Sequence, residues 1–426
     1  MLYHFFPDLK EHIDTIYIDP RRRNSCTYNL SELILATVYM YMLRQGSRSR
    51  VNENRTYLEY RRNYKQIFGL KLPNMDTVDD LLIKLDVDIL NRLRKYIIML
   101  LLKKRIFHKF RLLDRYFTIA IDGTGIFKFD KEPYSGCPYK TSKAGKVTYI
   151  QSVVEAKLVM PNGFSISIDT EWINNTDGET KQDCEQNATK RLLSRMKNDY
   201  KRLPVCILID GLYANQPTMK AIKVENKWEF IIVWKDKTLY SLQDEVADHR
   251  KQNLVINQYK ERILNQYCRI EKYYQYDPEP LSNITCPIYY MKLEENEIDI
   301  RIEEDTKSTK FVFMSSIPVR NANYKALIKA GRLRWKIENE GFNVQKNNGF
   351  AFHHKMNRKN LEAIKNYYIC LQIAHIFDQL LTLSLNTYVH CWNTIKGMWQ
   401  YVCSALTILT DYQPPPVTDK KYNYRY

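Results

Sequence analysis

Two short apolar segments that end in the same way constrain the fold of this chain more than any other feature. Residues 118–121 (TIAI) are followed by Asp122 and a glycine, and residues 206–209 (CILI) are followed by Asp210 and a glycine. Both runs are rich in β-branched residues, which predicts buried strands. An Asp-Gly pair is also a common turn signal, so a hairpin turn explains either segment by itself. Two carboxylates at the ends of buried strands can instead hold a divalent metal ion such as magnesium.

A third acidic candidate lies in the segment GRLRWKIENEGFNVQKNNGF. On a helix, Arg334, Glu338 and Phe342 are four residues apart and share one stripe, and Lys346 lies about 80° around the axis from Glu338. Glu340 lies about 200° from Glu338, so a regular helix presents only one of these glutamates to the site. Charge pairs at this spacing are also typical of an ordinary surface helix.

Three acidic side chains in one chain suit phosphodiester chemistry. Cleavage or transfer of a phosphodiester requires charge neutralisation at the attacking and leaving oxygens, which two metal ions held by shared carboxylates provide. Basic residues beside the third carboxylate would then bind the phosphates of the substrate.

Changes in hydrophobic periodicity divide the 426 residues into five parts. Helical spacing predominates at both ends of the chain, and β-branched runs alternate with helical segments between them, which predicts an α/β fold. The predicted parts are a helical DNA-binding region over 1–112, the first part of the core over 113–235, a β-rich insertion over 236–308, the second part of the core with the acidic helix over 309–355, and a helical C-terminal region with a basic tail over 356–426.

The charge balance indicates the class of partner. The chain holds 65 Lys and Arg residues against 48 Asp and Glu residues, a formal net charge of +17 at pH 7. An excess of this size attracts polyanions, so we expect a nucleic acid partner. Basic residues alternate with tyrosines in the N-terminal region, which suits phosphate contacts or a solvated face in equal measure. No apolar run reaches the roughly 18 residues of a spanning helix, and the first residues lack a secretory pattern, so we expect a cytoplasmic protein without membrane contact.

The motifs around the three acids together resemble a known family. IDGTG at Asp122, KQDCE ending at Glu185, ILIDGLYANQP at Asp210 and RWKIENEGFNVQKNNGF at Glu338 resemble the insertion-sequence transposases of the DDE class. The resemblance implies an RNase H-like mixed-sheet core that is split by the β-rich insertion. It also implies that Asp122 and Asp210 are the first two metal-binding aspartates and that Glu338 is the third acidic ligand, with two Mg²⁺ ions that Mn²⁺ can replace.

One large group of these transposases carries a Tyr-Arg-Glu-Lys signature, which Arg334, Glu338 and Lys346 resemble. The common signature has six residues between Glu and Lys, whereas seven separate Glu338 from Lys346. A bulged helical turn near Gly341 would absorb the extra residue. The Arg-Trp-x-Ile-Glu run favours Glu338 over Glu340 as the ligand. Position 331 is glycine, which leaves either Tyr324 or no residue in the place of the signature tyrosine.

Other residues near these motifs have two interpretations each. Trp335 could stack on a displaced base beside the cleavage site, or it could belong to the core. Asp183 and Glu185 could support the site, or they could be charges on an exposed amphipathic helix.

The resemblance implies DNA cleavage at transposon ends followed by strand transfer into target DNA. Its implied partners are the terminal inverted repeats, the target DNA and a second copy of the chain on DNA, in the nucleoid of a prokaryotic cell. Two alternatives share the fold. One is a transposase-derived DNA-binding protein without catalysis, and the other is a metal-dependent nuclease that cuts DNA but never joins ends.

Overall fold

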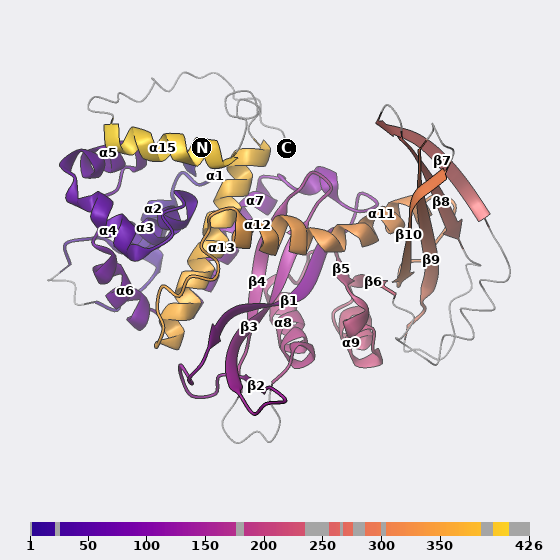
Figure 1. The fold of residues 1–426 in the computed structure, drawn as a ribbon, viewed down its shortest axis with the longest axis horizontal. Helices are drawn as coiled ribbons and strands as arrows, with labels where there is room; N and C mark the ends of the chain where they lie inside the picture. The colour runs from indigo at the N-terminus through magenta and orange to yellow at the C-terminus, as the bar shows by residue number, and fades with distance from the viewer. Residues whose placement is uncertain are drawn as a thin grey trace.

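The computed structural model describes residues 2–21, 26–175, 183–234, 255–264, 267–275, 286–299, 304–384 and 395–408. Its architecture is mixed α/β, with one mixed sheet and helices around it (Figure 1). This confirms the α/β class that the periodicity predicts. The predicted tail over residues 412–426 lies outside the described residues.

Helices form the N-terminal region, as its apolar spacing predicts. Every residue of the third helix is buried, so helices surround it on all sides. The Glu32 carboxylate anchors its start, because it accepts hydrogen bonds from the backbone N–H groups of Asn29 and Lys71, each at 3.0 Å. The helices are α1 (Leu2–Phe5), α2 (Leu9–Ile16), α3 (Leu30–Met42), α4 (Arg48–Thr56), α5 (Leu58–Phe68), α6 (Met75–Lys84) and α7 (Val87–Lys103), followed by a 3₁₀ turn at His108–Phe110.

The described strands join in a ten-stranded sheet with the order β2-β3-β1-β5-β6-β10-β9-β8-β7, and β4 pairs with β3. β1 is antiparallel to β3 and parallel to β5, which is in turn parallel to β6. The strands are β1 (Phe117–Phe129), β2 (Tyr139–Thr141), β3 (Val147–Val159), β4 (Ser165–Ile173), β5 (Val205–Ile209), β6 (Glu229–Val233), β7 (Val255–Leu264), β8 (Tyr267–Gln275), β9 (Tyr289–Asp299) and β10 (Glu304–Ser315).

The β-rich segment extends this same sheet. β10 pairs with β9 along its length and with β6 at residues 313–315. The predicted boundary at residue 308 therefore falls inside one strand, which runs from the insertion into the core. In Figure 1 these strands project from the edge of the core, beyond β6. Residues 235–254 lie outside the described part of the chain.

The remaining helices cover the sheet or join it to the N-terminal region (Figure 1). The long helical segment predicted near the third acid is interrupted by 3₁₀ and π turns. The helices are α8 (Glu185–Asp199), α9 (Gln216–Lys220) with a π turn at Ala221–Glu225, α11 (Tyr324–Arg332), a 3₁₀ turn at Leu333–Trp335, a π-helix at Ile337–Asn343, α12 (Val344–Asn347), α13 (Leu361–Ser384) and α15 (Ile395–Ile408).

The two faces of the sheet carry separate apolar clusters. Ala120 and Leu208 pack in one cluster with Ile337 of the π-helix. Ile119 and Ile207, their neighbours along the strands, pack in the other cluster together with residues of α8. Because strand side chains alternate between faces, this division shows which face each strand residue presents. None of the described helices is long and apolar enough to cross a membrane.

Candidate carboxylate site at the end of the parallel strands

Asp122 and Asp210 lie at the same level of two neighbouring parallel strands. Ala120 is paired with Leu208 in the register between β1 and β5, and each aspartate follows two residues later. Asp122 shares its face of the sheet with Ala120, which is the face that the π-helix covers. Asp210 comes directly after β5, where its Oδ1 accepts a hydrogen bond of 2.8 Å from the backbone N–H of Leu212. The two predicted strands therefore bring these aspartates together. The prediction that both strands end at their Asp-Gly pair holds only for Asp210: β1 runs on through Asp122 to Phe129, because its pairing with β3 continues past the aspartate.

Arg334 connects the helical segment to the strand. Its guanidinium lies 3.4 Å from Oδ2 of Asp122 and 3.6 Å from Oε2 of Glu338. The arginine side chain is only 10% exposed, whereas that of Glu338 is 50% exposed. The structure thus places one cation between two of the three predicted acidic ligands.

Lys346 reaches the same strand from the end of the π-helix. Its Nζ donates a hydrogen bond of 3.2 Å to Oγ1 of Thr124, two residues beyond Asp122. The π-helix spans Ile337–Asn343, and its i to i+5 hydrogen bonds accommodate one more residue than an α-helical turn. This confirms the bulged turn that the spacing of Glu338 and Lys346 predicts near Gly341.

Burial and repulsion make Asp122 the most perturbed acid of the site. Burial raises the pKa of Asp122 to about 6, opposed by Arg334 and reinforced by the negative charges of Glu338 and Asp210. Glu338 and Asp210 each act on Asp122 in this way, as neighbouring negative charges do. A bound cation would relieve this repulsion.

Glu340 points to a different partner. Its Oε1 accepts from Nζ of Lys336 at 2.6 Å, so the geometry places Glu338 rather than Glu340 beside Asp122. Trp335 packs edge-on against Phe311 and Phe313 at 5.5 and 6.4 Å between ring centroids, as the core interpretation predicts.

Tyr324 is buried at the start of α11, where its ring packs against that of Tyr273 at 5.8 Å between centroids. It lies ten residues before Arg334 along the chain.

Glu185 is a fourth carboxylate behind the site, which the sequence marks only as one of two supporting candidates. A Cβ atom added at Gly123 would lie 2.5 Å from the Glu185 carboxyl carbon, so the glycine next to Asp122 makes room for it. Burial raises the pKa of Glu185, and Asp210 adds to the effect, against a hydrogen bond from Tyr213. Asp183, the other candidate, forms an ion pair of 2.7 Å with Arg191.

The donor set suits magnesium in its chemistry. Among the described residues, no group of three or more His, Cys, Asp or Glu side chains is gathered tightly enough to hold a metal ion, and the Arg334 guanidinium stands between Asp122 and Glu338. The three predicted ligands nevertheless offer only carboxylate oxygens, which magnesium prefers. Arg334 Nε is a buried donor without a hydrogen-bond acceptor in the described structure, and a water or an anion such as a phosphate oxygen would satisfy it.

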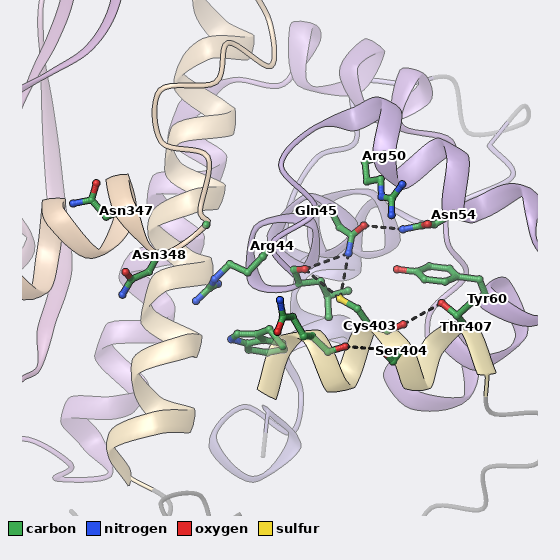
Figure 2. A pocket seen from close by; sticks show the side chains of 14 residues that line it. Arg44, Gln45, Arg50, Asn54, Tyr60, Asn347, Asn348, Cys403, Ser404 and Thr407 are labelled. Carbon is green, nitrogen blue, oxygen red and sulfur yellow. Dashed lines mark hydrogen bonds between the residues drawn. The ribbon is translucent and has the colours of Figure 1, made fainter. Parts of the chain in front are cut away.

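A cavity of the described structure lies away from the carboxylates. It has a volume of about 770 Å³ between the N-terminal helices, α15 and residues 347–349 (Figure 2). Arg44 at its wall is fixed internally, because it forms a 3.0 Å ion pair with Asp378 and stacks 3.6 Å from the centre of the Phe350 ring. The amide groups of Gln45 and Asn54 bond to each other at 2.7 Å.

Comparison with known proteins gives no relative. No protein-family model matches the chain, and no curated protein matches it either.

Proposed function

We propose that the chain is a DDE transposase that cuts DNA at the ends of a mobile element and joins those ends to target DNA. The observation that carries the proposal is that Asp122 within β1, Asp210 directly after β5 and Glu338 of the π-helix lie near one another, with Arg334 beside Asp122 and Glu338. Lys346 lies on the same side and donates to Thr124 of β1. Carboxylates next to basic groups are the combination that phosphodiester transfer requires.

The strand order supports an RNase H-like core. The strands run β4-β3-β1-β5-β6, the first three antiparallel and the last two parallel to β1. Helix α8 stands between β4 and β5 in the chain. Asp122 comes from the central strand β1 and Asp210 follows its parallel neighbour, so both carboxylates lie where the two strands adjoin.

In the proposed reaction Asp122, Asp210 and Glu338 would hold two magnesium ions. When bound, these ions supply charge neutralisation for the attacking and leaving oxygens of the phosphodiester. Arg334, which lies beside Asp122 and Glu338, would bind phosphate oxygens of the DNA, and Lys346 would bind a neighbouring phosphate. In cleavage a water oxygen bonds to phosphorus and a 3′-oxygen leaves. In joining, that 3′-hydroxyl attacks a phosphorus of the target, whose own 3′-oxygen leaves.

The test is magnesium-dependent cleavage and joining on DNA that carries the ends of the encoding element. Wild type should cut and join, and Asp210→Ala should do neither while it still binds the DNA. Glu338→Gln should lose at least about a hundredfold in rate, and the matched control Glu340→Gln should stay within about threefold of wild type, because Glu340 pairs with Lys336 instead.

Each other result assigns a different function. Cleavage without joining would identify a nuclease with the same core, and tight binding without any chemistry would identify a DNA-binding protein. If Glu340→Gln is inactive and Glu338→Gln is active, the third ligand is Glu340. A complex with DNA that contains two copies of the chain would support the proposal that two copies bring two element ends together.

A further inference from the structure

Lys157 is a charged side chain inside the core that the proposed reaction does not use. It lies on β3 with no solvent exposure. Burying an ammonium group is costly unless other groups compensate its charge, and burial lowers the pKa of Lys157 to about 8 despite the nearby Glu155. Its Nζ donates to Oε1 of Gln372 at 2.8 Å and lies 3.9 Å from Oε2 of Glu155.

The aliphatic part of Lys157 packs against the middle of the π-helix. A Cβ atom added at Gly341 would lie 3.1 Å from Cδ of Lys157 and 3.0 Å from Oγ of Ser165. The missing side chain at Gly341 therefore lets the π-helix pack closely on this lysine. Nζ of Lys157 also lies 5.6 Å from the centre of the Phe342 ring, and cations are attracted to ring faces at this range.

A hydrogen-bond relay joins Lys157 to the residue before Lys346. Oε1 of Gln372 accepts from Nζ of Lys157 and from Nε2 of Gln345, each at 2.8 Å. Gln345 is completely buried and follows the π-helix within α12. Lys157 is therefore in contact with the middle of the π-helix and, through Gln372, with the turn that carries Lys346.

A π turn needs such support because the wider turn is rare and less favourable than a regular helix. Without it, the segment between Glu338 and Lys346 would relax toward α-helical geometry. The extra residue would then turn Lys346 by about 100° around the helix axis, and its hydrogen bond to Thr124 would be lost.

We propose that Lys157 is a positioning residue that holds the π-helix and thereby places Lys346 on the same face as Glu338. This rests on the proposed function, because the placement matters only if these side chains act at one site. The lysine works through Gln372 and Gly341 and does not itself touch the DNA.

The test is a double-mutant cycle on the rate of DNA cleavage. Lys157→Met and Lys346→Ala should each slow cleavage by about tenfold or more. The double variant should be little slower than Lys346→Ala alone, because coupled residues have non-additive effects. If the rate loss of the double variant equals the product of the two single losses, the proposal is overturned.

Arg94→Met is the matched control. Arg94 is also a buried cation, bonded to Ser167 and Thr170 of β4, which in turn bond to Glu155 beside Lys157. Its described hydrogen bonds and ion pairs lie outside the π-helix, so its loss disturbs the same buried charges without removing a contact to that helix. Its loss should reduce stability, and its effect on the rate should multiply with that of Lys346→Ala. If Lys157→Met does not fold, Gln372→Met interrupts the same relay and should give the same cycle.

Amide hydrogen exchange separates this inference from the proposed function. Residues 338–346 should exchange at least about tenfold faster in Lys157→Met than in wild type, and Arg94→Met should leave them protected. If the wild type cuts no DNA, the proposed function fails and the exchange still shows whether Lys157 holds the π-helix. Unchanged exchange in Lys157→Met overturns the inference, whatever the activity.

Discussion

The ionised carboxylate of Asp122 is disfavoured by its surroundings, which are buried and lie near two other negative charges. Burial raises its pKa to about 6, and the charges of Glu338 and Asp210 add to the effect, while Arg334 offsets only part of it. Such strained carboxylates are common at functional sites, where a cation or a substrate completes the charge balance. In the proposed metal site, the loss of folding stability that the raised pKa of Asp122 implies results from placing several acids close together, where a bound cation would neutralise them.

Asp122→Asn should therefore stabilise the metal-free protein at pH 7. The folded state holds a proton on Asp122 more tightly than the unfolded chain does, so wild-type stability falls as pH rises from about 4 to about 6. The gain from the amide should be roughly 1–3 kcal/mol at pH 7 and should vanish near pH 4. Urea unfolding at both pH values measures it. A variant less stable than wild type at pH 7 would contradict the assignment.

Magnesium should stabilise the wild type and leave the stability of Asp122→Asn unchanged. A ligand that binds only the folded state stabilises it in proportion to the logarithm of its concentration. The melting temperature of wild type should rise by about 2–4 °C with millimolar magnesium, and that of Asp122→Asn should not change. Equal shifts in both proteins would place the magnesium elsewhere.

Among the elements, the π-helix shows what the sequence could predict and what it could not. The extra residue between Glu338 and Lys346 is visible in the spacing and predicts a bulge near Gly341, which the structure contains. The support from Lys157 and Gln372 is invisible, because it depends on residues far apart in the chain that meet only in the folded core.

The same distinction holds for the acids. Asp122 and Asp210 are predictable because each follows an apolar, β-branched run of the sequence, and such runs form neighbouring strands. That β1 continues beyond Asp122 was not predictable, because the continuation depends on pairing with β3. Glu185 carries no such signal, since its position depends on how α8 packs and on the space at Gly123. The π turn at Ala221–Glu225 is equally hidden, because helical periodicity assumes a regular turn.

Shortening the π-helix by one residue should affect cleavage much less than lengthening it by one. Asn343 is exposed, so its deletion restores six residues between Glu338 and Lys346 and should convert the π turn into a regular helix. Cleavage should stay within about tenfold of wild type, whereas one alanine inserted after Asn343 should rotate Lys346 by about 100° and reduce cleavage by at least about a hundredfold. Equal losses in both variants, with melting temperatures near that of wild type, would contradict the role of the turn.

At the scale of the whole molecule, the basic residues differ in whether they are free to contact the proposed DNA partner, because some of them form ion pairs within the protein. Of the basic residues in the N-terminal region, Arg44 forms an ion pair with Asp378, and Arg48 forms one of 2.7 Å with Asp79. These arginines join the N-terminal helices to each other and to α13. Arg61 and Lys65, four residues apart on α5, are exposed and therefore better placed to meet phosphates.

Replacing Arg61 and Lys65 together by alanine should weaken DNA binding and reduce its dependence on salt. Each lysine or arginine that neutralises a phosphate contributes about −0.9 to the slope of log K against log salt concentration, so the slope should become less negative by about 2. Lys201→Ala with Arg202→Ala is the matched control, because both are exposed but precede β5, at the end of the strand opposite to Asp210. Fluorescence anisotropy between 50 and 300 mM salt measures both slopes. An unchanged slope for the α5 variant, or an equal change in the control, would contradict contact between α5 and the phosphates. DNA binding would then depend on the overall positive charge and not on particular residues of α5.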